Sequence, residues 1–209
     1  FVTPERAVTP QITNITATTN SATIYWSKNG GTAGEWRLFY GTSASNLQLY
    51  GTISSSPVSV SGLTSGTSFM FMIRNWVSAT DYKDSILSSV KTKNNIGTFS
   101  WTADDASTIV SGQPVTNITA AAWQKLAALV NQVRVANGNN SISIPSVASG
   151  QQITASVFNT MRGYIAGLVG AGSVVGGVSS GGIIYASYFA NGTSALKEAV
   201  NRAIASANA

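Results

Sequence analysis

Ile118-Thr-Ala-Ala-Ala-Trp123 decides the fold of the second half of this chain, because the phrase recurs twice. It returns as Ile153-Thr-Ala-Ser-Val-Phe158 and, more loosely, as Ile184-Tyr-Ala-Ser-Tyr-Phe189. Repetition at a spacing of a few tens of residues is typical of supersecondary units that bury their apolar faces against one another. The repeat therefore favours a structural or assembly role over an enzyme built around a catalytic pocket.

The residues that follow each copy have the spacing of amphipathic helices. Apolar side chains recur three and four positions apart after Trp123 and after Phe158. The stretch Asn117-Ile-Thr119, in which Asn117 suits helix capping, offers the first cap, and Thr154 offers the second. Asn191-Gly-Thr193 marks a break or a new cap within the third copy. We expect helices near residues 119–135, 154–169 and 185–206.

The first half of the chain has a different pattern, with short β-type runs about ten residues apart and turn residues between them. Within Thr23-Ile-Tyr-Trp26, Ile24 and Trp26 share one face while Thr23 and Tyr25 share the other. This pattern predicts an antiparallel β-sandwich with one buried and one wetter face on each sheet. The expected strands include Ala22–Trp26, Trp36–Tyr40, Val58–Ser61, Phe69–Ile73 and Ser88–Thr92.

These residues resemble the fibronectin type III domain over about residues 9–93. The likeness rests on Trp26 at the end of the second strand, the aromatic run Trp36–Tyr40, and Leu63-Thr-Ser-Gly-Thr-Ser-Phe69. The resemblance implies an immunoglobulin-like sandwich in which Trp26, Leu63 and Phe69 are core residues. Phe69 stands where the family often has tyrosine, so the hydroxyl bond of a tyrosine corner is absent.

The second half resembles a helical repeat module of phage and prophage structural proteins of Gram-positive bacteria. The matching phrases are Phe99-Ser-Trp101, Gly112–Trp123, Gly150–Asn159 and Gly182–Phe189. Gln124 departs from the asparagine that usually follows the tryptophan of that module. The resemblance implies a bacteriophage virion component such as a head fibre, a decoration protein or a tail-associated protein.

We therefore expect a multidomain chain, with an all-β sandwich followed by a mainly α-helical module of short repeated helices. A polar, turn-rich stretch after the last strand marks the boundary. The expected parts are an N-terminal arm at 1–8, the sandwich at 9–93, a linker at 94–98 and the helical repeat module at 99–209.

The surface of this protein is polar but weakly charged. Charged residues make up 9% of the sequence, against about 25% in ordinary soluble domains. The net charge is +5, yet the basic residues never form a run, so we do not expect nucleic-acid binding. A surface of Ser, Thr, Asn, Gln and Gly costs little to desolvate and favours packing against copies of the same chain.

No charge occurs between Gly163 and Leu196, which raises the question of membrane insertion. The segment is rich in glycine and serine, and these residues lower both helix propensity and transfer free energy. We expect a flexible glycine-rich connector here rather than a membrane span. Within it, Gly170, Gly172 and Gly176 miss the spacing of a dinucleotide-binding loop and instead indicate a flexible or closely packed turn.

Residues that could carry chemistry are scarce. The sequence has no histidine and no cysteine, which removes the commonest general base, nucleophile and metal ligands. Asp81 with Asp84, or Asp104 with Asp105, could supply two carboxylates, but their turn-like contexts favour solvated loop positions. Ser194-Ala-Leu-Lys197 matches the serine-x-x-lysine motif of penicillin-binding enzymes, but the companion motifs of those enzymes are missing from the sequence. We therefore expect no catalytic, cofactor-binding or metal-binding residues.

The aromatic residues of the sandwich are the remaining candidates for a binding surface. Tyr40, Tyr50, Trp76 and Tyr82 could form a sugar-stacking or protein-docking patch, although strand aromatics more often pack in a core or across strands. No ligand site can be named from the sequence, so the binding residues stay unknown.

The expected function is that of a non-enzymatic structural protein of a virion. Its partners would be further copies of itself, other virion proteins, or both, with weak glycan binding in addition. The alternative is a secreted or cell-surface bacterial adhesion module whose sandwich binds glycan or protein.

Overall fold

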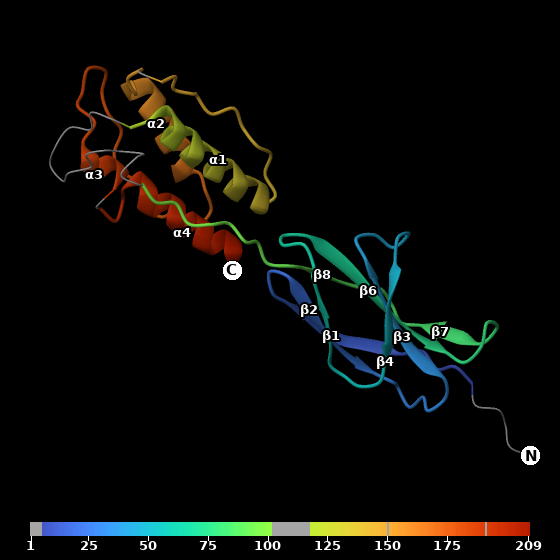
Figure 1. Cartoon of the computed structure of the whole chain (residues 1–209). Helices are drawn as coiled ribbons and strands as arrows, with labels where there is room; N and C mark the ends of the chain where they lie inside the picture. Colours follow the sequence, from blue (N-terminus) through green and yellow to red (C-terminus); the bar gives the residue numbers. More distant parts are fainter. Residues whose placement is uncertain (1–5, 102–117, 150, 191) are drawn as a thin grey trace, which may run out of the picture. The chain divides into compact units, whose positions relative to one another are not determined.

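The computed structural model describes residues 6–101, 118–149, 151–190 and 192–209 (Figure 1). The chain divides into two compact units between Asn95 and Ile96. We call the part up to Asn95 the sandwich unit and the part from Ile96 the helical unit. The expected fold class, an all-β sandwich followed by a helical region, is confirmed by these elements.

The sandwich unit consists of two antiparallel sheets. The smaller sheet has the order β1-β2-β5, and the larger has the order β4-β3-β6-β7, with β8 also paired to β6. Its strands are β1 Gln11–Ala17, β2 Ser21–Ser27, β3 Glu35–Gly41, β4 Gln48–Ile53, β5 Val58–Ser61, β6 Ser68–Trp76, β7 Tyr82–Asp84 and β8 Ser88–Lys91. The strands β1, β4 and β7 were not among the runs expected from sequence, because they lie at sheet edges and carry few buried side chains.

Alternation along the strands creates the core of the sandwich. Ile24 and Trp26 are buried while Tyr25 is 39% exposed, as the period-two pattern predicted. The rings of Trp26 and Trp36 lie 5.5 Å apart across the two sheets. Leu63 and Phe69 are also buried, which confirms both as core residues.

Ala7 and Val8, which the sequence placed in an N-terminal arm, are bonded to the sandwich. Val8 N–H donates to Oδ1 of the fully buried Asn75 at 2.8 Å, and Asn75 Nδ2 donates to the Ala33 carbonyl at 2.8 Å. Ala7 N–H donates to the Asp81 carboxylate at 3.3 Å. An asparagine inside the core thus binds the backbone of two separate segments.

The helical unit contains α1 Ala120–Ala136, α2 Ala155–Ala166, α3 Ala186–Phe189 and α4 Leu196–Asn208. Thr119 and Thr154 cap α1 and α2, because their hydroxyl groups accept the first-turn amides of Ala122 at 3.1 Å and Val157 at 3.3 Å. The first two repeat copies therefore start helices in the same way.

The expected helical span near residues 185–206 contains two helices, and the break predicted before Leu196 is confirmed. The structure has the single-turn helix α3 and then the separate helix α4, which begins at Leu196. Tyr185 occupies the position of the capping threonine of the other copies, and a turn in which Ala195 N–H donates to the Gly192 carbonyl separates the two helices. The expected helix 154–169 also ends early, at Ala166, because Gly167 is its C-cap and Gly170 has a φ of +80°.

The aromatic residue of each repeat copy lies in one shared core. Trp123 and Phe158 are fully buried and Phe189 is 1% exposed. The rings of Phe158 and Phe189 meet edge to face at 5.5 Å. Leu126 and Val130 of α1 and Val200 of α4 belong to the same cluster. The repeat thus gives each helical element an aromatic anchor for a common interior.

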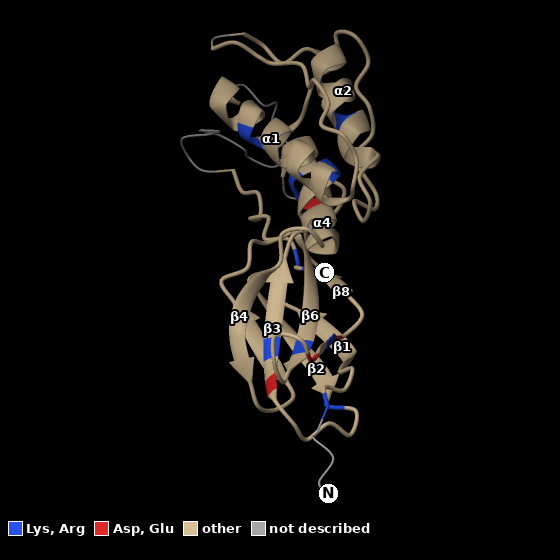
Figure 2. Ribbon diagram, turned by 90° about the vertical axis from the view of Figure 1, so that its right-hand side faces the viewer, with Lys and Arg blue, Asp and Glu red and all other residues tan. Residues whose placement is uncertain are grey.

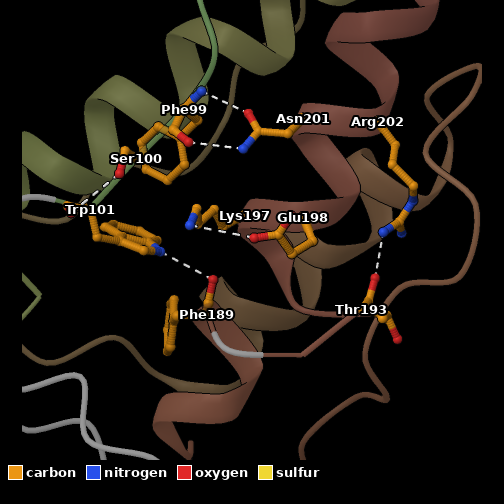
Figure 3. A network of polar contacts seen from close by, with 9 residues as sticks. All are labelled: Phe99, Ser100, Trp101, Phe189, Thr193, Lys197, Glu198, Asn201 and Arg202. Carbon is orange, nitrogen blue, oxygen red and sulfur yellow. Dashed lines mark hydrogen bonds and ion pairs between the residues drawn. The ribbon is translucent and has the colours of Figure 1, made fainter.

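Asparagine side chains on the helices bind the extended segments that run over them. In each case the amide oxygen accepts the N–H of one residue while the amide nitrogen donates to the carbonyl of that same residue, with distances of 2.7 to 3.0 Å. We call these pairs the asparagine clamps: Asn131 with Ile142, Asn159 with Val178, Asn201 with Phe99, and Asn208 with Ile96. Figure 3 shows the clamp between Asn201 and Phe99.

Two arginines bind backbone carbonyls of the glycine-rich segment, which the sequence predicts to be a flexible connector. Arg202 Nε donates to the Ala171 carbonyl at 2.7 Å and Nη2 donates to the Ser173 carbonyl at 2.6 Å. Arg202 also donates to the Thr193 carbonyl (Figure 3), and Arg162 donates to that of Val175. Ala171 within the segment is buried. Charged side chains of α2 and α4 thus bind carbonyl groups of a segment that contains no charge of its own.

The expected linker, residues 94–98, is shorter in the structure. Lys93 N–H still donates to the Thr18 carbonyl of the sandwich at 2.9 Å. Ile96 already belongs to the helical unit, where Asn208 clamps it. Asn94 and Asn95 stand between these two bonded positions in sequence.

Replacing Gly170 by alanine is expected to destabilise the helical unit by about 2 kcal/mol or more, because a side chain strains its positive φ and collides with α4. A Cβ at Gly170 would lie 2.4 Å from Ser206 Cβ. Gly176 is the matched control, because a Cβ there has no neighbour within 4 Å. Thermal unfolding followed by far-ultraviolet circular dichroism compares G170A with G176A. Equal melting temperatures for the two variants would contradict the close packing at Gly170.

Replacing Asn201 by alanine is expected to cost about 2 kcal/mol, because both hydrogen bonds to Phe99 are lost. Asn201→Asp keeps the acceptor but cannot donate to the Phe99 carbonyl, so this variant stays destabilised. Hydrogen–deuterium exchange of the peptide Ile96–Trp101 is the measurement, and its exchange should accelerate in both variants. The exposed Asn139, changed to alanine, serves as the control and should leave this exchange unchanged.

Candidate functional site

The outer face of the larger sheet carries a row of alternating arginine and aromatic side chains. Trp36 and Leu38 of β3 point into the core. Arg37 and Phe39, which alternate with them along the strand, therefore face outward. The same alternation turns Arg74 and Trp76 of β6 outward, and register places Tyr82 of β7 opposite Trp76. We call Arg37, Trp76, Tyr82, Arg74 and Phe39 the arginine–aromatic ladder.

Neighbours along the ladder stack on one another. The Arg37 guanidinium lies 4.5 Å from the Trp76 ring centroid, and the rings of Trp76 and Tyr82 stack at 5.8 Å with a 16° angle between their planes. The Arg74 guanidinium lies 4.3 Å from the Tyr82 ring and 5.3 Å from the Phe39 ring. Cation–π contacts of this kind stabilise a sheet face. Ladder members already contact the Trp76 and Tyr82 rings, which leaves less ring surface for stacking against a sugar.

Carboxylates neutralise both arginines of the ladder. Arg74 Nε and Nη2 donate to the two oxygens of Asp84 at 2.6 and 2.8 Å. Arg37 Nη2 donates to Glu35 at 2.9 Å. The hydrogen bond with Asp84 raises the pKa of Arg74 above its ordinary value, despite the opposing effect of burial. The guanidinium therefore stays charged and fixed in the plane that the stack requires.

The predicted aromatic patch is not a single surface. Trp76 and Tyr82 belong to the outer ladder, whereas Tyr40 lies on the other face of the sheet, against the sandwich core. Tyr40 stacks near Phe71 at 6.4 Å and meets Tyr50 edge to face at 6.1 Å. The four residues thus form two pairs, one on each face of the sheet, because strand alternation separates them.

The carboxylates considered for catalysis have structural partners. Asp84 is paired with Arg74, and Asp81 accepts the Ala7 amide. Asp104 and Asp105 lie outside the described residues. Lys197 forms an ion pair with Glu198 at 3.4 Å (Figure 3). Within the described ranges, no three His, Cys, Asp or Glu side chains come together as a metal-binding group would require.

The helical unit contains a cavity of about 1320 Å³ at the starts of the three repeat copies. The first residues of the copies, Ile118, Ile153 and Ile184, all line it, and so do the capping residues Thr119 and Thr154. We call it the repeat cavity. Its other lining side chains are hydroxyl, amide or apolar groups, including those of Ser149, Gln151, Gln152, Ser156, Asn159, Val178, Ser180, Ile183 and Phe189.

Among the residues that the structure describes, those that line the repeat cavity carry no charge. General acid–base catalysis needs a side chain that exchanges a proton near the working pH. The wall offers hydrogen-bond donors, hydrogen-bond acceptors and apolar carbon instead. The described part of the wall can therefore form hydrogen bonds and apolar contacts with a neutral polar molecule.

Charged positions are sparse in both units, as Figure 2 shows. In the helical unit, Arg134, Arg162 and Arg202 each donate to a backbone carbonyl. Within the described part of the chain, no helix is long and apolar enough to cross a membrane.

Comparisons with family models and with curated proteins give no match to this chain. The resemblance of the C-terminal half to phage structural modules therefore has no support from them. Among solved structures, the sixth fibronectin type III domain of human fibronectin type III domain containing protein 3 is 16% identical, with a TM-score of 0.40, over 47% of this chain and 97% of that domain. Another fibronectin type III domain of human fibronectin type III domain containing protein 3 is 18% identical, with a TM-score of 0.37, over 46% and 94%.

A computationally redesigned β-sandwich protein is similar over 40% of this chain and 95% of its own, with 16% identity and a TM-score of 0.34. The sandwich architecture of this protein is established by the order and register of its own strands.

Sequence reasoning missed both the ladder and the cavity. The signal for the ladder was present, because arginine and aromatic residues alternate with core residues in Trp36-Arg-Leu-Phe39 and Ile73-Arg-Asn-Trp76. The repeat was a signal for the cavity, because the first residues of similar units that pack together tend to lie near one another. Its depth depends on loop paths that sequence patterns do not specify.

Replacing Arg74 by lysine is expected to destabilise the sandwich unit by about 1 to 2 kcal/mol. An ammonium group cannot form the two-pronged bond to Asp84 while lying flat on two rings. Urea unfolding followed by tryptophan fluorescence measures the change. Lys83, an exposed residue of the same hairpin, provides the reverse control as Lys83→Arg, which should be neutral within about 0.5 kcal/mol. Equal stability of R74K and the parent protein would show that the ladder contributes nothing.

Proposed function

We propose that this protein is a non-enzymatic structural protein, most specifically a bacteriophage virion component such as a head fibre, decoration or tail-associated protein. It self-associates or docks through the helical unit and presents the sandwich unit. One observation carries the proposal: the polar side chains of the helical unit hold their own backbone. The asparagine clamps and the bonds from Arg162 and Arg202 use groups that an enzyme would direct at a substrate.

Exposed apolar residues on the helical unit support association between copies of this chain. Val169 is 60% exposed, Val135 is 57% exposed and Ile183 is 54% exposed. With so few charges in the sequence, two such surfaces meet with little electrostatic repulsion and little loss of ion hydration. We therefore propose a second copy as the first partner, other virion proteins as further partners, and the virion as the location.

A secreted or cell-surface adhesion module is the second candidate. The repeat cavity favours it, because a neutral wall of hydroxyl and amide groups suits recognition of an uncharged ligand. Neither candidate requires a cofactor, a nucleic acid or catalysis.

Static light scattering across a concentration series tests the assembly role on the full chain. We expect a molar mass that rises with concentration to a closed oligomer or a filament, and Val169→Asp should lower it by burying a charge at the contact. Ile86→Asp is the matched control, because Ile86 is 86% exposed but lies in the sandwich unit. A monomer at every concentration, or an equal effect of the two variants, would argue against assembly through the helical unit.

A further inference from the structure

We propose that the repeat cavity is a binding site for a neutral oligosaccharide. This inference rests on the non-enzymatic role proposed above and names the ligand class that the helical unit would recognise. The cavity volume of about 1320 Å³ exceeds the roughly 300 to 1,000 Å³ of pockets that hold a small molecule. The space therefore suits several linked sugar rings better than a single small metabolite.

The chemistry of the wall selects a neutral ligand. The lining side chains within the described residues are uncharged, so a carboxylate, phosphate or ammonium group placed against them would find no ion-pair partner there. Hydroxyl groups of Ser149, Ser156 and Ser180 and amide groups of Gln151 and Gln152 can both donate and accept hydrogen bonds. Sugar hydroxyl groups have the same dual character, so wall and ligand are complementary.

The wall also has the apolar component that a sugar ring needs. Ile118, Ile153 and Ile184 line the cavity together with Val178. Each pyranose ring presents C–H groups on its faces and hydroxyl groups around its edge. Apolar side chains beside hydroxyl and amide groups match these two surfaces, whereas a uniformly apolar wall would favour a lipid.

The cavity is built on rigid elements. Capped ends of α1 and α2 supply Thr119 and Thr154, and Asn159, which lines the cavity, clamps the backbone of its lining neighbour Val178 at 2.7 and 2.9 Å. Pre-formed walls lower the entropy cost of binding a flexible ligand. The three repeat copies thus have a purpose beyond filling a core, because together they position one ligand cavity.

Titration of the ¹⁵N-labelled full chain by NMR tests the inference. Maltotetraose and chitotetraose are the neutral probes, and tetragalacturonate is the charged probe of similar size. At least one neutral probe should shift the amide signals of lining residues such as Gln152 and Ser180, and tetragalacturonate should bind about tenfold more weakly or not at all. The absence of cavity shifts with both neutral probes at about 10 mM, or preference for the charged probe, would overturn the inference.

Matched variants assign any shifts to the cavity. Ser180 is an exposed lining residue and Ser179, its exposed neighbour, does not line the cavity. Ser180→Trp should occupy part of the space beside the ligand and weaken binding by about tenfold or more, while Ser179→Trp should change it less than about twofold. Equal effects of the two variants would overturn the assignment to the cavity, as would shifts confined to the arginine–aromatic ladder.

The same samples separate this inference from the proposed function. Cleavage products of the probe in the proton spectrum would contradict the non-enzymatic role, even if the probe binds in the cavity. Absence of binding with intact probe overturns only the ligand inference and leaves the assembly role to light scattering.

Discussion

The structure of the helical unit depends on one interaction, the pairing of an asparagine side chain with both polar groups of a single backbone residue. A primary amide has the same donor and acceptor as a peptide unit, so it replaces the missing neighbour strand of an extended segment. Four clamps of this kind bind segments before α1, after α1 and after α2 to the helices beneath them. Without them, the loops would expose unpaired backbone groups over a hydrophobic core.

This mode of construction explains the unusual composition. The helical unit forms hydrogen bonds from asparagine side chains to its loop backbone, so it needs few charged residues for this purpose. A charged residue of its helices, Arg202, also donates hydrogen bonds to backbone carbonyl groups. The sandwich unit solves a related problem differently. Its largest outward face would expose Phe39 and Trp76, and stacked guanidinium groups cover those rings while carboxylates hold the guanidinium groups in place. Both units therefore use polar side chains chiefly for architecture.

Sequence patterns predicted the elements with strong local signals. The sandwich class and its core residues Trp26, Leu63 and Phe69 followed from period-two alternation, and α1 followed from a threonine cap with apolar residues at helical spacing. In the third repeat copy the prediction placed a break before a helix through Leu196, and the structure has the one-turn helix α3 followed by α4. The contacts of the glycine-rich segment were not predicted. Its order comes from Asn159, Arg162 and Arg202, which lie outside it or far along the chain, and such pairings leave no local pattern.

The clamp between Ile96 and Asn208 joins the entrance and the exit of the helical unit, which are 112 residues apart in sequence. Tension applied through the chain on both sides of this unit would act first on that pair and next on Phe99 with Asn201, which follows it inward. The two clamps would therefore open one after the other and not at the same time. Both pairs join the segment that enters the unit to α4, so the beginning of the helical unit is tied directly to its last helix.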